Sequence, residues 1–227
     1  MTAVPPVVDE KTWRDAVAEL RVREKAATHE RDAIAAARRR LPALRMPEYR
    51  LTAEDGSTVT LADMFDGASQ LVTYHHMWQD GAEWQCPVCT GNTASWMRTE
   101  LLSELDARFV AVATGSMDDI LAYKKRTGNE MTWYSSADSP FAADVDNPAD
   151  GGGGFNVFLR DGDDVYRTWF TTGRGMEPFK LSFAISDVLP YGRQEQWQDV
   201  PDGWPQDESV TFQRFHSAAD IAALYGE

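Results

Sequence analysis

Two cysteines constrain the fold of this chain more than any other feature, because they lie three positions apart between a predicted strand and a predicted helix. Residues 70–76 form an apolar run of strand length, and a polar loop at 77–85 follows it. Cys86-Pro87-Val88-Cys89 then begins a helix predicted over 87–105. Proline suits the first helical position, where a missing N–H leaves no hydrogen bond unmade. The sequence therefore predicts a buried strand followed by a thiol pair at the start of a helix.

The other predicted elements place this unit in an α/β chain. Strand patterns occur at 49–51, 58–61, 70–76, 109–113, 131–135, 155–159 and 165–170, and helix patterns at 117–126, 176–189 and 217–225. A loop rich in Asp, Pro and Gly is predicted at 137–154. The central order is strand, helix, strand, helix and then a strand hairpin. That order is typical of a thioredoxin-like fold, which has a parallel and an antiparallel half.

The length of 227 residues suits one α/β domain with extensions at both ends. Apolar residues recur every seven positions from Trp13 to Leu41 and predict one long helix over 9–41. Asp9 is its expected N-cap, and Pro42 stops it. The helix either packs along the domain or joins two copies in a homodimer. We predict an N-terminal helical extension at 1–47, a thioredoxin-like domain at 48–190 and an irregular C-terminal extension at 191–227.

Composition argues against several classes of partner. The formal net charge of −14 should repel nucleic acid and anionic membranes. No uncharged apolar run approaches the roughly 18 residues of a membrane-spanning helix. The first residues lack the basic and apolar regions of a signal peptide. These features predict a cytoplasmic protein, in which a close cysteine pair is more often redox-active or metal-binding than structural.

The position of the pair at a helix start indicates thiol chemistry. The thiolate is the reactive form, and the unpaired N–H groups and dipole of a helix N-terminus stabilise it. Cys86 at the N-cap is therefore the expected nucleophile, and Cys89 is the expected resolving thiol. A structural zinc site would need a second cysteine pair, and the sequence contains two cysteines in all. A pair of buried, unreactive thiols is the structural alternative.

His75 and His76 precede the pair on the predicted strand. Adjacent strand residues point to opposite faces, so one of the two rings faces the cysteines. A strand histidine beside the pair could act as a general base, which makes His75 a catalytic candidate together with Cys86 and Cys89. The same three residues form a candidate Cu(I) site, because that ion favours thiolate and imidazole ligands. The structural alternative is a hydrogen-bonded core histidine.

The loop before the pair carries acidic and aromatic side chains. Asp80 and Glu83 would raise the pKa of a nearby thiol or accept its proton, unless they are solvated. Trp78 and Trp84 either shield the site, bind a flat apolar substrate or pack in the core. The charge state of the thiols therefore depends on how this loop folds.

A series of short segments between residues 38 and 162 carries a family resemblance. They are Arg38-Arg-Arg-Leu-Pro42, Leu61-Ala-Asp-Met-Phe-Asp-Gly67, Gln70-Leu-Val-Thr-Tyr-His-His-Met77, Cys86-Pro-Val-Cys89, Ala122-Tyr-Lys-Lys-Arg-Thr-Gly128, Trp133-Tyr-Ser-Ser136 and Val157-Phe-Leu-Arg-Asp-Gly162. In order and spacing they resemble the bacterial thioredoxin-like family known as domain of unknown function 899, over residues 8–190. The resemblance implies a thioredoxin-like fold and a dithiol–disulfide oxidoreductase role. Both cysteines and His75 match the family's pattern, whereas His76 replaces what is more often an aromatic residue.

Two departures from this pattern bear on the substrate. Relatives usually carry a proline before the tryptophan of the 133–136 segment, where Met131 and Thr132 stand here. Thioredoxins also place a cis-proline opposite the cysteine pair, and the corresponding residues 151–155 contain no proline. Because that proline helps to dock an extended protein chain, its absence favours a small-molecule substrate. The glycine run there permits close backbone approach.

Three functions fit these observations. The first is a dithiol–disulfide oxidoreductase or thiol peroxidase that uses no cofactor and acts on a small-molecule thiol, disulfide or peroxide. The second is a copper-binding protein or copper-dependent enzyme with His75, Cys86 and Cys89 as ligands. The third is a redox-sensing assembly module in which the long helix joins two copies. The sequence favours the first.

Overall fold

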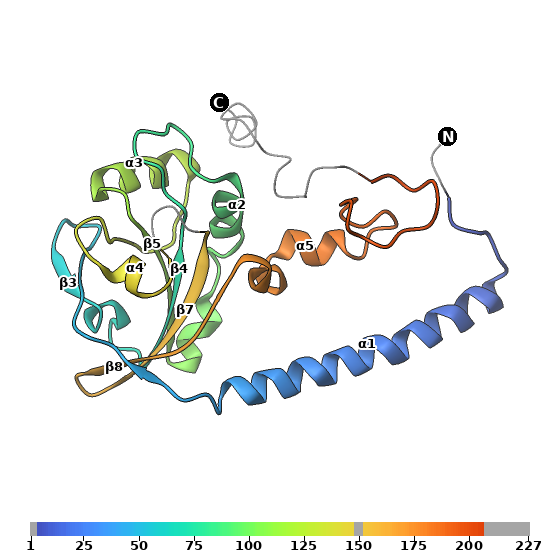
Figure 1. The fold of residues 1–227 in the computed structure, drawn as a ribbon, viewed down its shortest axis with the longest axis horizontal. Helices are drawn as coiled ribbons and strands as arrows, with labels where there is room; N and C mark the ends of the chain where they lie inside the picture. The colour runs from blue at the N-terminus through green and yellow to red at the C-terminus, as the bar shows by residue number, and fades with distance from the viewer. Residues whose placement is uncertain (1–3, 148–151, 207–227) are drawn as a thin grey trace. The chain divides into compact units, whose positions relative to one another are not determined.

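The computed structural model describes residues 4–147 and 152–206 (Figure 1). They fall into two units, one of residues 4–42 with 199–205 and one of residues 43–147 with 152–198 and 206. The helix predicted at 217–225 lies outside the described residues. The division into three parts and the cytoplasmic location remain predictions. None of the helices within the described ranges is long and apolar enough to cross a membrane.

The first unit contains α1, a helix of 29 residues that runs from Glu10 to Arg38. Asp9 caps it as predicted, because its carboxylate accepts a hydrogen bond from the Thr12 amide at 2.7 Å. The helix ends at Arg38 rather than at the predicted residue 41, and a turn leads on to Pro42. No residue of α1 is buried. The homodimer in which the apolar residues of this helix join two copies stays a prediction.

The second unit is built on an eight-stranded sheet with the order β1-β8-β7-β4-β5-β6-β2-β3. Its strands are β1 (Leu44–Arg45), β2 (Arg50–Thr52), β3 (Thr58–Thr60), β4 (Gln70–His75), β5 (Ala107–Ala113), β6 (Trp133–Ser135), β7 (Gly154–Asp161) and β8 (Asp164–Thr172). Its α-helices are α2 (Pro87–Ser95), α3 (Met117–Thr127), α4 (Phe141–Asp144) and α5 (Leu181–Ser186). Three 3₁₀ helices complete it, η1 (Asp63–Phe65), η2 (Glu100–Leu105) and η3 (Gly173–Phe179).

The central strands have the pairing of a thioredoxin-like fold. Strand β4 lies parallel to β5 and antiparallel to β7, and β7 forms an antiparallel hairpin with β8. The crossover from β4 through α2 to β5 is the parallel half, and the hairpin is the antiparallel half. The α/β thioredoxin-like fold predicted from the sequence is therefore confirmed. In Figure 1, α2 lies beyond the end at which β4 finishes.

The two faces of the sheet bury different side chains. Val110 and Val112 of β5 pack in a core with Phe141 of α4. Ala111, between them, packs in a second core with Ile120 of α3. This alternation follows from the pleat, which points successive side chains to opposite faces. The same rule decides which residues of β4 reach the cysteines.

The helix predicted over 87–105 is two shorter segments. Helix α2 ends at Ser95, because residues 90–95 include Thr, Gly, Asn and Ser, which are weak helix formers. The 3₁₀ helix η2 follows, with a tighter period than that of an α-helix. Leu101 and Leu105 would lie on the buried side of a continuous helix over 87–105, but in the structure they are 74% and 65% exposed.

Other predicted boundaries also shift. The helix predicted at 176–189 is divided between η3 and α5, since Pro178 lacks the N–H that a continuous helix needs. The predicted loop at 137–154 contains the short helix α4, which buries Phe141. Strand β1 was not predicted, because two residues are too few to form a pattern.

Candidate active site

Helix α2 presents both cysteines at its N-terminus, as the sequence predicts. Cys86 is the N-cap residue, Pro87 follows in the first turn, and the Cys89 amide donates a hydrogen bond to Cys86 Sγ at 3.5 Å. Both thiols are free. Cys86 is half-buried, whereas Cys89 is 2% exposed. The pair thus combines an accessible sulfur with a buried one three residues further on.

The surroundings of the two sulfurs drive their pKa values apart. A hydrogen bond from the Cys89 thiol lowers the pKa of Cys86 to about 7. Burial opposes this shift, while the amides of Cys89 and Val88 and the charge of Lys180 support it. The pKa of Cys89 is raised well above its ordinary value, first because its thiol donates to Cys86 and then because it is buried. Near neutral pH, Cys86 is therefore the thiolate of the pair and Cys89 keeps its proton.

Tyr74 extends this hydrogen-bonded chain beneath the cysteines. Its buried hydroxyl donates to the Cys89 sulfur and accepts a hydrogen bond from the Asn92 side chain. The Met77 amide donates a further hydrogen bond to Cys89. Burial, followed by the charge of Cys89, raises the pKa of Tyr74 well above its ordinary value. Its hydroxyl therefore stays a donor at any pH at which the protein would work.

Gly153 approaches the cysteine pair from the start of β7. A Cβ atom there would lie 2.9 Å from the Tyr74 hydroxyl, 3.0 Å from the His75 carbonyl oxygen and 3.3 Å from Cys89 Sγ. Since the carbonyl is backbone, it cannot move aside easily, and this position requires glycine. The close backbone approach that the glycine run permits is thus present beside Cys89.

The pair opens into a cavity of about 290 Å³. Lining residues come from β4, α2, the glycine segment before β7, and the η3–α5 segment. They are Tyr74, Met77, Cys86, Val88, Cys89, Asn92, Gly152, Gly153, Gly173, Arg174, Met176, Glu177, Lys180 and Phe183. Apart from the thiols, the walls near the pair are mostly apolar. The cavity is therefore a concave, mostly apolar space beside the two thiols.

The charged groups of this cavity come from the η3–α5 segment. Glu177 is held by two guanidinium groups, at 2.9 Å from Arg174 and 3.1 Å from Arg193. Lys180 is 9% exposed, and its ammonium lies 4.6 Å from the centre of the Phe183 ring. Burial lowers the pKa of Lys180, against the opposing charges of Cys89, Glu177 and Cys86. The side of the cavity that faces the thiols is thus cationic.

His75 lies on the other face of β4 from the cysteines. Tyr74, the residue before it, packs with Cys89, whereas the His75 ring packs 5.5 Å from Phe141 and bonds the Thr73 hydroxyl at 3.2 Å. Burial and then the charge of Arg167 lower the pKa of His75 to about 3. The structure therefore brings Cys86 and Cys89 together but does not bring the His75 ring to them. Its surroundings match the hydrogen-bonded core histidine.

The candidate copper ligands are therefore not assembled. Within residues 4–147 and 152–206, no group of three or more His, Cys, Asp or Glu side chains could hold a metal ion. His76 faces the same side of the sheet as Tyr74, but its ring is enclosed by Trp78, Tyr123 and Trp133. Burial lowers the pKa of His76 to about 4.

The acidic and aromatic residues of the preceding loop lie away from the cavity. Asp80 and Glu83 are exposed and do not line it, and Glu83 lies 3.7 Å from Arg126. Trp78 and Trp84 are buried in the core that covers α3. Of the three roles considered for the two tryptophans, the structure therefore supports packing in the core.

Sequence reasoning missed three polar residues of the site, Tyr74, Asn92 and Lys180. The alternation of β4 could have found Tyr74, because it points to the face opposite His75. Helical spacing could have found Asn92, which follows Cys89 by three positions. No local signal marks Lys180, since the path of the chain after β8 brings it to the cavity.

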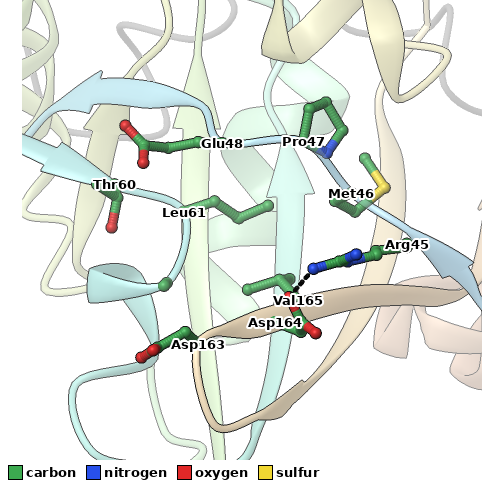
Figure 2. A pocket seen from close by; sticks show the side chains of 10 residues that line it. Arg45, Met46, Pro47, Glu48, Thr60, Leu61, Asp163, Asp164 and Val165 are labelled. Carbon is green, nitrogen blue, oxygen red and sulfur yellow. Dashed lines mark hydrogen bonds and ion pairs between the residues drawn. The ribbon is translucent and has the colours of Figure 1, made fainter.

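A larger pocket of about 570 Å³ lies elsewhere in the same unit, between β1, the end of β3 and the β7–β8 turn. Figure 2 shows Arg45 reaching to Asp164, with which it forms an ion pair, and Glu48, Thr60 and Asp163 around them. The ten residues that line it include no cysteine or histidine. This pocket therefore has charged side chains but no thiol like those at the start of α2.

One protein family and several solved structures are similar to this chain. The model of the family described as bacterial protein of unknown function, DUF899, matches residues 2–210. No curated protein matches the chain. Among solved structures it is similar to peroxidoxin BcpB of Mycobacterium tuberculosis, at 11% identity and a TM-score of 0.45, over 58% of this chain and 85% of that one. It is also similar to the reduced 2-Cys peroxiredoxin of Plasmodium vivax, at 16% identity and a TM-score of 0.43, over 59% and 82%. A secreted M. tuberculosis disulfide oxidoreductase shows 15% identity and a TM-score of 0.36, over 55% and 82%.

Proposed function

The chain belongs to the DUF899 family of bacterial proteins, and we propose that it is a dithiol–disulfide oxidoreductase with Cys86 as nucleophile and Cys89 as resolving thiol. One observation carries the proposal. Cys86 caps α2 at the mouth of a cavity, its pKa is lowered to about 7, and the buried thiol of Cys89 donates to it. A structural pair of thiols would need neither the cavity nor the separation of pKa values.

With a disulfide as substrate, the chemistry runs in two exchanges. The Cys86 thiolate attacks one sulfur, so that a Cys86–substrate disulfide forms, the substrate's S–S bond breaks and one thiolate leaves. Cys89 then loses its proton and attacks Cys86 Sγ, which forms the Cys86–Cys89 disulfide and releases the second thiolate. Both leaving thiolates take up protons, and two electrons pass from the protein to the substrate.

With a peroxide, Cys86 attacks one oxygen of the O–O bond. The S–O bond forms, the O–O bond breaks, and an alcohol or water leaves after protonation. Cys89 then attacks the Cys86 sulfenic acid, water leaves, and the same Cys86–Cys89 disulfide results. Both routes need a separate reductant of the thiol class to return the pair to its starting state.

Tyr74 assists the second step in either route. Its hydroxyl donates to the Cys89 sulfur, and this hydrogen bond favours the Cys89 thiolate that the step requires. Because Asn92 donates to the same hydroxyl, the tyrosine is held in the donating orientation. Tyr74 touches the reacting sulfur and is therefore part of the proposed catalytic site.

The size of the cavity favours a small substrate. A volume of about 290 Å³ lies at the lower end of the range of small-molecule sites. Gly153 lies against Cys89 just before β7 begins at Gly154. Thioredoxins place at this point the cis-proline that helps to dock a protein chain, and no proline stands here. We therefore expect a small disulfide or peroxide rather than a general protein disulfide.

The proposal is tested by following the reduced protein after it meets bis(2-hydroxyethyl) disulfide or hydrogen peroxide. Mass spectrometry should find the intramolecular Cys86–Cys89 disulfide in the unmodified chain. Cys89→Ser should stop at the mixed disulfide or sulfenic acid on Cys86. Cys86→Ser should react about a thousandfold more slowly, the scale of loss expected for a nucleophile. A Cys86→Ser protein that is folded, as circular dichroism reports, and still reacts at the original rate would refute the proposal.

A further inference from the structure

Lys180 lines the cysteine cavity; its side chain is 9% exposed, and its ammonium keeps contact with solvent. No hydrogen bond or ion pair joins it to any residue within the described ranges. Its recorded neighbour is the Phe183 ring, whose centre lies 4.6 Å away. An ammonium that lines a cavity and has no carboxylate bonded to it can form a charge-assisted hydrogen bond with an anion that enters the cavity.

The acid that lines the same cavity is already engaged. Both oxygens of Glu177 are occupied, Oε1 by Arg174 at 2.9 Å and Oε2 by Arg193 at 3.1 Å. Arg193 also bonds both oxygens of Asp187, at 2.7 Å each. Lys180 therefore differs from the two arginines near the cavity, because each arginine is bonded to a carboxylate and Lys180 is not.

The Cys86 thiolate is one of the anionic groups near Lys180 in the reduced protein, together with Glu177, and its charge is lost during the proposed reaction. When Cys86 forms a mixed disulfide or a sulfenic acid, its sulfur no longer carries a charge. Glu177, which two arginines already hold, is then the anion that remains near the ammonium, unless the substrate brings another. A carboxylate on the substrate, a few atoms from the attacked sulfur or oxygen, would replace the lost charge at that moment.

The remaining walls set limits on the rest of such a substrate. Val88, Met77, Met176 and Phe183 give the cavity an apolar surface, and its volume of about 290 Å³ admits a short compound. The net charge of −14 makes the protein as a whole repel anions. An anionic preference at this site must therefore come from local groups.

We propose that the cysteine cavity is selective for small disulfides or peroxides that carry a carboxylate, and that Lys180 is the residue that selects them. This assignment rests on the proposed oxidoreductase function. It specifies the substrate class of that site and makes Lys180 a specificity-determining residue, in contact with the anionic group rather than with the reacting bond.

The test compares two alkylating agents that differ chiefly in charge. Iodoacetate and iodoacetamide both alkylate the Cys86 thiolate and release iodide, but iodoacetate carries a carboxylate. The ratio of their rates on Cys86, divided by the same ratio on free cysteine, reports anion preference. Because both rates depend on the same thiolate, any effect of Lys180 on the pKa of Cys86 cancels in the ratio.

Lys180→Met should lower this ratio about tenfold, which corresponds to about 1.4 kcal/mol. Lys180→Arg should keep most of it. Lys125→Met is the matched control, since Lys125 is exposed on α3 and its loss changes the net charge equally. Added salt should lower the ratio of the unmodified protein toward that of free cysteine. An unchanged ratio in Lys180→Met, or equal slowing of both agents, would overturn the proposal.

A second comparison uses disulfides. Dithiodiglycolate should be reduced with a higher kcat/KM than neutral bis(2-hydroxyethyl) disulfide, and Lys180→Met should remove this preference without lowering the rate on the neutral compound to the same extent. Failure of both disulfides and of hydrogen peroxide to react would count against the oxidoreductase function. The alkylation ratio would still decide the anion site in that case, so the two failures are distinguishable.

Discussion

The cysteine cavity and the pocket between Arg45 and Asp164 lie at opposite ends of the β4–β7 pair. The pairing of β4 with β7 sets Gly154 beside His75 at the cysteine end and Leu159 beside Gln70 at the other, where the β7–β8 turn borders the larger pocket. The pocket between Arg45 and Asp164 is the larger, at about 570 Å³ against about 290 Å³. Its arginine is already paired with an aspartate of the same pocket (Figure 2).

The difference teaches that thiols with separated pKa values and a cation without a bonded carboxylate, rather than pocket size, point to the cysteine end of this sheet as the proposed site. The cysteine cavity has a thiol with a lowered pKa, a buried thiol that donates to it and an ammonium with no carboxylate bonded to it. The larger pocket is lined by carboxylates and one arginine, Arg45, which is exposed to solvent and forms an ion pair with Asp164. Exposed ion pairs of this kind contribute little free energy.

The largest effect on stability should come from Gly153→Ala, with Gly152→Ala as its matched control. A methyl group at 153 would press on the Tyr74 hydroxyl, the His75 carbonyl and Cys89 Sγ, whereas nothing lies within 4 Å of a Cβ at 152. Overpacking of this kind costs about 1–3 kcal/mol. Chemical denaturation should report that loss for Gly153→Ala, along with slower formation of the Cys86–Cys89 disulfide. Equal stability of the two variants would show that the backbone does not approach the thiols so closely.

A narrower effect, confined to one step of the reaction, should follow Tyr74→Phe, which removes the hydroxyl that donates to Cys89. A hydrogen bond to a charged group is worth about 1.5–3 kcal/mol, so the second step should slow about tenfold or more. Attack by Cys86 should change far less, because its thiolate is held by Cys89 and backbone amides. Rapid-quench mass spectrometry would separate the two steps through the lifetime of the mixed disulfide. Equal slowing of both steps would show that Tyr74 acts on the fold rather than on Cys89.

The smallest effect should come from the other end of the sheet. Asp164→Asn removes the exposed ion pair with Arg45, and turnover of the disulfide should stay within about twofold, with a stability change of less than about 1 kcal/mol. Urea denaturation and steady-state rates would check both. A loss of activity comparable to that of Cys86→Ser would break the comparison, because it would make the larger pocket part of the working site.

Much of this fold could be predicted from the sequence, because its central elements carry strong local patterns. The apolar run before Cys86 is β4, the cysteines begin α2, and the last hairpin is β7 and β8. Predictions that assumed one continuous period failed where weak helix formers or Pro178 interrupt it, as in the segments after Ser95 and Met176.

The site could be predicted only as far as its local part. The thiol pair could be predicted because a helix N-terminus lowers the pKa of a cysteine that lies next to it in the sequence. The sequence favours His75 because alternation places one of the two adjacent histidines toward the cysteines, and because His75 matches the pattern of the family that the chain resembles. Alternation instead sets Tyr74 beside Cys89, and His75 joins the opposite core. Lys180 depends on tertiary structure, since it approaches Cys86 from a segment more than ninety positions away in the sequence.

The most direct test of the account is the pH dependence of Cys86 alkylation by iodoacetamide, a neutral probe. Because the pKa of Cys86 is lowered, its thiolate should be present above pH 7 and lost as the pH falls, with the midpoint of the rate at about 7. Peptide mapping should find Cys89 unmodified throughout that range, since its pKa is raised. A midpoint at the ordinary thiol value of about 8.5, or a Cys89 that reacts before Cys86, would contradict the assignment of Cys86 as the nucleophile.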